Sequence, residues 1–181
     1  LMPSWARLDL FPSDHPLFVG SFGTHGTRHG NFAIQNADLL LSIGCRLDTH
    51  ETGSPITTFA REARKIIVDI DPSELGKFKT LGVVIDILAE ADAADFLHAA
   101  NERLDGFALP DIGACMERIA GWKARYPTCP DRYRDERDTN PYVFVKTLSR
   151  EAAEGEVLFV DTGCIIAWMT QAFEFRGRQR M

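Results

Sequence analysis

Short apolar runs alternate with amphipathic stretches along most of the chain. The runs over residues 38–43 and 65–70 are continuous, which is typical of strands covered on both faces of a parallel sheet. Weaker apolar runs predict two further strands, over 83–86 and 157–160. Helical spacing of apolar residues predicts helices over 25–37, 56–63, 89–104, 112–126 and 141–152. Strands that alternate with helices in this way predict an α/β fold with a doubly wound parallel sheet.

A polar segment interrupts this alternation. Residues 127–140 contain two prolines and the charged run 131–138, which predicts a linker on the surface. One strand with two helices follows, and these elements are too few to bury a sheet. We therefore expect a first domain over residues 1–126 and the opening part of a second domain over residues 141–181.

Composition narrows the class of protein. The 181 residues are 45% hydrophobic and 25% charged, which suits one globular domain or one domain with part of another. The net charge of −6 argues against a nucleic-acid partner. No apolar run approaches the roughly 18 residues of a membrane span, and no signal peptide is visible. Four scattered cysteines without a Cys-x-x-Cys pair exclude a zinc ribbon. We expect a cytoplasmic protein with reduced thiols.

Three glycines at a spacing of three precede the first predicted helix, in Gly20-Ser-Phe-Gly23-Thr-His-Gly26. Glycine allows close approach of the backbone to a ligand, and a helix N-terminus offers free N–H groups to an anion. The spacing differs from the dinucleotide-binding fingerprint, so a plain turn into a helix is the favoured interpretation. His25 and His29 could share a helical face and bind a metal, but no third ligand is evident.

Charged residues follow the two clearest strands, at the edge where open parallel sheets hold ligands. Arg46 could clamp a phosphate, or it could form a surface pair with Asp48, and the two interpretations have equal weight. Asp69 could accept hydrogen bonds from a ribose, whereas Asp71 is better explained as a helix cap. Cys164 near a helix start could be a thiolate, but a plain small residue at a turn is the favoured interpretation.

An ordered series of motifs carries a resemblance to a known family. The motifs include Gly23-Thr-His-Gly26, Asn36-Ala-Asp-Leu-Leu-Leu41, Ile43-Gly-Cys-Arg46, Ile67-Val-Asp-Ile-Asp-Pro72 and Asp161-Thr-Gly163. In this order they resemble the central domain of thiamine-diphosphate-dependent enzymes, and most closely the acetolactate synthase large subunit and its relatives. The match covers nearly the whole chain and is more specific for the superfamily than for the reaction.

The resemblance implies a Rossmann-like central domain with a six-stranded parallel sheet, which holds FAD in a structural role in acetolactate synthases. The first strand and helix of that sheet and the motif that binds Mg²⁺ would lie outside residues 1–181, so the expected fold is incomplete at both ends. By position, the residues near the FAD would be Phe22, Gly23, Thr24, His25, Gly26, Arg46, Asp48, Asp69, Ile70, Asp86 and Ile87. Gly163 and Cys164 would contact the thiamine diphosphate.

Two positions depart from the family pattern. His50 stands where the family often has an arginine, which removes a fixed charge near the expected FAD. Gly163-Cys-Ile165 stands where the family usually has Gly-Gln-His. These departures favour a divergent relative.

The resemblance implies a fragment of a carboligase or decarboxylase that acts on a 2-oxo acid with thiamine diphosphate and Mg²⁺. We expect a homo-oligomer, and we do not expect the fragment to be active alone, because the family's activating glutamate lies in another domain. The alternative is a domain without catalysis, which binds FAD, ADP or coenzyme A or serves only in oligomerisation. Identification of the small molecules that the purified protein binds distinguishes these hypotheses.

Overall fold

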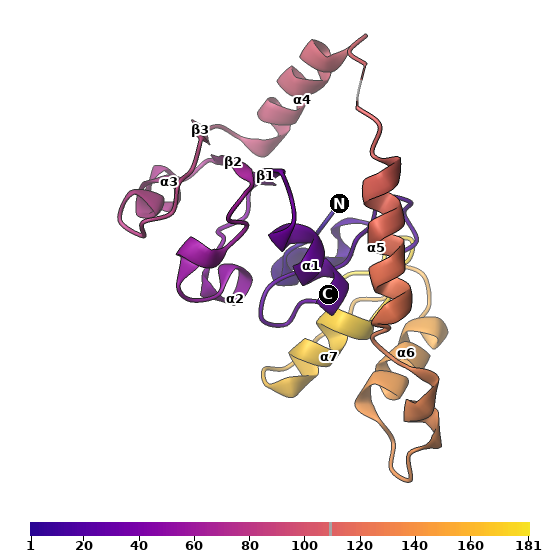
Figure 1. Ribbon diagram of the computed structural model, residues 1–181. Helices are drawn as coiled ribbons and strands as arrows, with labels where there is room; N and C mark the ends of the chain where they lie inside the picture. Colours follow the sequence, from indigo (N-terminus) through magenta and orange to yellow (C-terminus); the bar gives the residue numbers. More distant parts are fainter. Residues whose placement is uncertain (109) are drawn as a thin grey trace. The chain divides into compact units, whose positions relative to one another are not determined.

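The computed structural model describes residues 1–108 and 110–181, and Figure 1 shows them as short strands and helices. Within these residues the chain packs as two compact units. The first unit combines residues 1–33 with residues 115–181, and the second unit contains residues 34–114.

The second unit is built on a parallel sheet whose three strands, among the described residues, lie in the order β1-β2-β3. They are β1 (Leu39–Ile43), β2 (Arg64–Asp69) and β3 (Ile87–Glu90). The central strand β2 pairs with both neighbours, and Ile67 and Val68 within it are almost fully buried. β-Branched residues suit such a strand because they pack well on a pleated surface. The parallel α/β fold predicted from the apolar runs is confirmed.

Each strand of this sheet leads through a turn into a helix that an aspartate caps. α2 (Thr49–Thr52), α3 (Pro72–Gly76) and α4 (Ala93–Leu104) follow β1, β2 and β3. Asp48, Asp71 and Asp92 accept hydrogen bonds from the first free N–H groups of these helices. The turns are therefore fixed by local chemistry, at the carboxyl ends of the strands. Two short 3₁₀ helices, η2 (Ile56–Thr58) and η3 (Lys77–Lys79), lie between these elements.

The first unit is mainly helical. Its elements are η1 (Trp5–Leu10), most of α1 (Arg28–Gln35), most of α5 (Gly113–Arg125), η4 (Asp131–Asp135), α6 (Pro141–Glu151) and α7 (Cys164–Ala172). Its core joins Leu8 of η1 to Val145 of α6 and Met169 of α7. Asp9 also forms an ion pair with Arg180, with a distance of 3.0 Å between Asp9 Oδ2 and Arg180 Nε. Segments near both ends of the sequence therefore share one core.

Two predicted strands differ from the structure. The strand expected over 83–86 begins instead at Ile87, because the Asp86 side chain accepts a hydrogen bond from the backbone N–H of Lys65 at 2.7 Å and ends the preceding loop. The segment 157–160 contributes only a single bridge between Val157 and Arg180. The helix expected over 56–63 is limited to η2. The strand predictions over 83–86 and 157–160 were based on apolar and β-branched composition. Composition alone does not provide a strand with a pairing partner.

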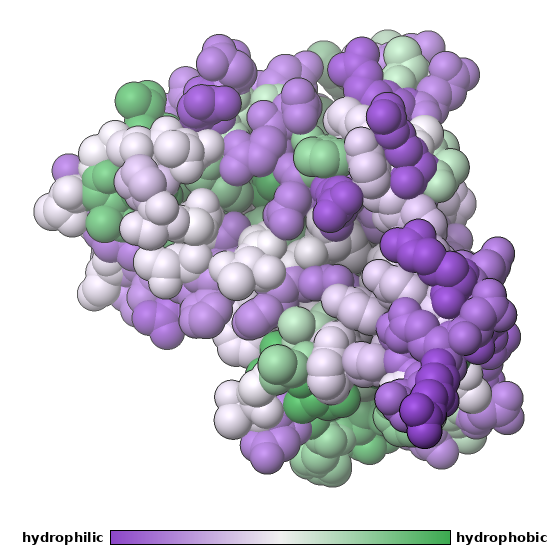
Figure 2. All heavy atoms as spheres, turned by 60° about the horizontal axis from the view of Figure 1, so that its bottom comes forward, coloured by the Kyte–Doolittle hydropathy of each residue, from purple (hydrophilic) through white to green (hydrophobic). Residues whose placement is uncertain are grey.

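Residues 127–140 lie inside the first packing unit, together with residues 1–33. Packing units and family domains need not coincide, so the domain division at this segment remains a prediction. Figure 2 shows hydrophilic residues over large stretches of the face that it draws, with hydrophobic residues in smaller groups. Among the described residues, no helix combines the length and the apolar character that crossing a bilayer requires.

Candidate functional site

The loops that follow the three strands surround an open hollow of about 450 Å³, here called the strand-end hollow. It lies at the carboxyl edge of the sheet, where open parallel α/β sheets hold their ligands. The loop after β1 supplies Gly44 and Arg46, and the carboxylates come from the end of β2, from α3 and from the turns before α3 and α4. Its lining residues are Gly44, Arg46, Asp69, Ile70, Asp71, Glu74, Ala91, Asp92 and Ala93.

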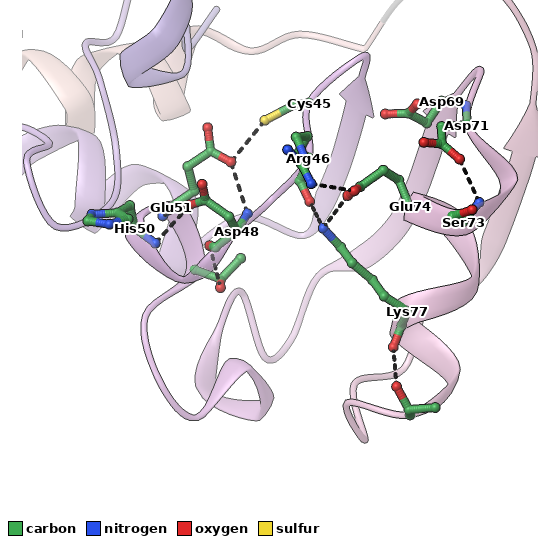
Figure 3. A network of polar contacts seen from close by, with 12 residues as sticks. Cys45, Arg46, Asp48, His50, Glu51, Asp69, Asp71, Ser73, Glu74 and Lys77 are labelled. Carbon is green, nitrogen blue, oxygen red and sulfur yellow. Dashed lines mark hydrogen bonds and ion pairs between the residues drawn. The ribbon is translucent and has the colours of Figure 1, made fainter.

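Arg46 is held at this hollow by residues of the helical segment that follows β2. Its Nη2 donates to Glu74 Oε1 at 2.7 Å, while Lys77 Nζ donates to Glu74 Oε2 at 2.7 Å and also to the Arg46 carbonyl (Figure 3). The hydrogen bond from Arg46, and then that from Lys77, lowers the pKa of the Glu74 carboxyl, and the bond with Glu74 raises the pKa of Arg46. The ion-pair partner of Arg46 is therefore Glu74, and the alternative pair with Asp48 does not form.

Asp69 and Asp71 have different roles. Asp71 caps α3 by accepting from the Ser73 N–H at 2.8 Å, which confirms the interpretation of Asp71 as a helix cap. Asp69 Oδ1 accepts from the Asp71 N–H at 2.9 Å, and in the described part of the chain no protein donor occupies its other oxygen. Ile70 between them is 67% exposed. One carboxylate oxygen at the end of β2 is thus available to a ligand.

Asp92, which was not predicted, lies at the strand-end hollow, and Asp86, which was predicted, does not line it. Asp86 precedes β3, at the amino edge of the sheet, where it forms an ion pair of 3.9 Å with Arg64. Asp92 follows β3 and lines the strand-end hollow, but it was missed. The signal was present, because Asp92 follows the apolar residues 87–89 much as Asp71 follows the second run. Placing the third strand four residues too early concealed it.

Asp48 belongs to a capping box rather than to the strand-end hollow. Its side chain accepts from the N–H groups of His50 and Glu51, and Glu51 accepts from the Asp48 N–H in return. Cys45 Sγ donates to the same Glu51 carboxylate at 3.3 Å. Burial and the charge of Glu51 raise the pKa of the Cys45 thiol to about 12, so this thiol stays protonated. This network, also drawn in Figure 3, fixes the loop after β1.

The glycine-rich segment lies in the first unit, where it forms a fixed turn into α1. Asn31 donates to the Gly23 carbonyl and accepts from the Gly23 N–H, at 3.0 and 2.8 Å. A Cβ at Gly26 would lie 2.4 Å from the Phe22 backbone, so glycine is required there. Phe22 is buried and Thr24 is exposed. The geometry agrees with a turn into a helix.

Gly163 and Cys164 begin α7. Gly163 has a φ of +96°, which favours glycine, and Cys164 is exposed at the first residue of the helix. Among the described residues, no group of three or more His, Cys, Asp or Glu side chains could hold a metal, and His25 and His29 have no third ligand. Of the predicted site residues, the structure brings Arg46, Asp69 and Ile70 together around one hollow.

A parallel sheet with an open hollow at the carboxyl ends of its strands places the second unit in the class of open α/β domains. A family profile described as the central domain of thiamine pyrophosphate enzymes matches residues 1–99, more than half of the chain. The chain therefore belongs to this family, as its motifs predict.

Curated relatives support the same assignment. A probable acetolactate synthase large subunit from Methanocaldococcus jannaschii is 34% identical over 91% of this chain and 28% of its own length. The acetolactate synthase large subunit of Corynebacterium glutamicum is 34% identical over 93% of this chain and 26% of its own length. The Escherichia coli isozyme 2 large subunit is 33% identical over 64% of this chain. The chain thus spans about a quarter of the length of the first two relatives.

Proposed function

We propose that the strand-end hollow binds the adenosine part of a nucleotide, with FAD as the first candidate. The observation that carries this proposal is the convergence of Asp69, Asp92 and Arg46 at the carboxyl ends of three parallel strands. A carboxylate in this position accepts hydrogen bonds from ribose hydroxyls, and an arginine can pair with a phosphate.

The charges around the hollow suggest which part of a nucleotide fits. The carboxylates of Asp69, Asp71, Glu74 and Asp92 face a single arginine, and Glu74 already bonds to that arginine. This balance favours hydroxyl and amino donors over a phosphate in the interior of the hollow. Gly44 adds no side chain, and a Cβ there would meet no atom within 4 Å. An adenosine therefore suits these residues better than a diphosphate does.

We further propose that the protein takes part in a thiamine-diphosphate-dependent reaction of a 2-oxo acid, of the acetolactate synthase type. Its relatives' names support the reaction class. Thiamine diphosphate, with Mg²⁺, supplies the carbanion chemistry when bound, and in this proposal Gly163 and Cys164 contact it. In this proposal residues 1–126 form the central domain, residues 127–140 the linker and residues 141–181 the opening of the pyrophosphate-binding domain. The protein works as a cytoplasmic homo-oligomer, and residues 1–181 alone do not complete the reaction.

Calorimetric titration of the 181-residue chain with FAD, ADP and coenzyme A tests the nucleotide site. We expect saturable FAD binding that Asp69→Asn and Asp92→Asn weaken about tenfold, the effect of losing one charge-assisted hydrogen bond. Arg64→Gln is the matched control, because Arg64 lies at the other edge of the sheet. Binding of ADP without FAD would select the domain without catalysis. No binding of any nucleotide would refute the site.

A separate assay tests the reaction. The chain is fused to the segments of an acetolactate synthase large subunit that it does not cover. We expect this fusion protein, and not the isolated chain, to consume pyruvate in a reaction that depends on thiamine diphosphate and Mg²⁺. Such activity in the joined protein, with none in the isolated chain, supports the proposal. Nucleotide binding without activity in the joined protein would refute the reaction and leave the nucleotide site intact.

A further inference from the structure

The first unit contains a second hollow, of about 290 Å³, whose charge is opposite to that of the strand-end hollow. Three arginines line it, and no carboxylate among the described residues does so. We call it the arginine hollow. Besides Arg28, Arg125 and Arg132, the residues that line it include Tyr126, Tyr133 and Tyr142.

Each of the three guanidinium groups lies over a tyrosine ring. The Cζ atoms of Arg28 and Arg125 lie 5.2 and 5.5 Å from the centroid of the same Tyr126 ring. Arg132 lies 5.2 Å from the centroid of the Tyr133 ring. A guanidinium stacked on a ring is pre-organised, and its N–H edge remains free to bond an anion in a forked geometry.

The rings are themselves fixed by packing. Tyr126, which directly follows α5, contacts Phe32 of α1 edge-on, with ring centroids 5.5 Å apart. Tyr133 lies beside Tyr142, whose hydroxyl donates to Gln171 Oε1 at 3.0 Å. The tyrosine rings beneath the arginines are therefore themselves held by neighbouring side chains.

The positive charge is a local feature. The chain carries net −6, and residues 131–138 contain four acidic and three basic side chains. Of these seven, only Arg132 lines the arginine hollow. Within the described residues, Arg28, Arg125 and Arg132 form no ion pair with a carboxylate, in contrast to Arg46, Arg64 and Arg180. Three unneutralised cations around one concavity create a positive potential that attracts anions.

We propose that the arginine hollow binds the phosphoryl group of a small phosphorylated compound. Arginine forks match the oxygens of a phosphate, and three of them suit a group with more than one negative charge. A volume of 290 Å³ lies near the lower end of small-molecule sites, which span roughly 300–1,000 Å³, so a compact ligand fits better than a dinucleotide. The proposal does not rest on the nucleotide site, which lies in the other unit and is rich in carboxylates.

Calorimetric titration of the 181-residue chain with inorganic pyrophosphate at low ionic strength tests this proposal. We expect saturable binding that Arg28→Gln, Arg125→Gln and Arg132→Gln each weaken about tenfold, which corresponds to about 1.4 kcal/mol. Arg132→Lys also weakens binding, because lysine keeps the charge but loses the fork and the stacking. Circular dichroism of each variant confirms that these exposed substitutions leave the fold unchanged.

Two controls separate a built site from general charge attraction. Arg134→Gln and Arg137→Gln remove the same charge from the same segment outside the hollow, and we expect them to leave affinity unchanged. Arg64→Gln removes an arginine of the other unit that lines neither hollow, and it should also have no effect. Three outcomes would each overturn the proposal. They are equal weakening by Arg134→Gln, an affinity that none of the three substitutions in the hollow changes, and the absence of saturable binding.

Discussion

Arg46 Nη2 and Glu74 Oε1 lie 2.7 Å apart and join the loop after β1 to the helix after β2. Arg46 comes from the loop after β1, and Glu74 lies in α3 after β2. Lys77 strengthens this connection by bonding to both residues. The arginine is thereby held at the rim of the strand-end hollow before any ligand arrives. This pre-organisation lowers the cost of ordering the side chain on binding.

The first prediction concerns Glu74→Gln. The substitution removes the charge that holds both Arg46 and Lys77, so we expect weaker FAD binding. The thermal midpoint should hardly change, because the Arg46 side chain is 76% exposed and surface ion pairs contribute little to stability. Glu62→Gln removes an exposed carboxylate of the same unit and serves as the control. A lower midpoint with unchanged FAD affinity would show that the pair stabilises the fold instead of positioning Arg46.

The second prediction concerns the core of the sheet. Ile67 in β2 is 1% exposed, so Ile67→Ala should lower the free energy of unfolding by about 2–5 kcal/mol through lost burial and a cavity. Ile70→Ala is the matched control, because Ile70 lies just beyond the same strand and is 67% exposed. Urea unfolding measures both changes. Equal destabilisation by the two substitutions would contradict the burial of Ile67 and the exposure of Ile70.

The third prediction is a dependence of stability on pH. Burial, and then repulsion from Lys123, lowers the pKa of His29 from its ordinary value of 6.5 to about 4. Between these two values the unfolded chain takes up a proton that the folded chain rejects, so stability falls as pH falls from 6.5 to about 4. Below pH 4 both states are protonated and this contribution to the loss ends.

Urea unfolding across this pH range measures the effect. Carboxylates also titrate at low pH, so the informative quantity is the slope of stability against pH in His29→Gln compared with the native chain. We expect a shallower slope for His29→Gln and an unchanged slope for His98→Gln, which alters an exposed histidine. A direct check is the titration of the His29 ring by NMR. A midpoint near 6.5 for His29 would contradict the buried, neutral imidazole.

Sequence reasoning identified the parts of the fold that depend on local pattern. The continuous apolar runs located β1 and β2, and Asp71 before Pro72 was correctly interpreted as a cap, because a cap depends on neighbouring residues. β3 was misplaced because its position depends on pairing with β2 and on the bond between Asp86 and Lys65. Those contacts join residues about twenty positions apart, which a local pattern does not contain.

The same limit applies to the candidate sites. Arg46 and Asp69 were named as site candidates because they lie at the ends of recognisable strands. Asp92 was not named, because the third strand was predicted four residues too early. The sequence did not determine the ion-pair partner of Arg46. Glu74 is 28 residues away and becomes its neighbour only because β1 and β2 pair in parallel. The arginine hollow combines residues from α1, α5, η4, α6 and α7, so no short motif marks it.

The fourth prediction orders the reactivity of the cysteines. The thiolate is the nucleophile in alkylation, and Cys45, with a pKa of about 12, has almost none at about pH 8. Cys115 and Cys164 are exposed, so iodoacetamide should modify them well before Cys45. Peptide mass spectrometry over time measures the order, and all four thiols should react at similar rates in urea.

Glu51→Gln should speed the alkylation of Cys45, because it removes a negative charge beside the thiol. If Cys45 reacted in the folded chain as fast as Cys164, the loop after β1 would have to open readily, which its capping box is expected to prevent.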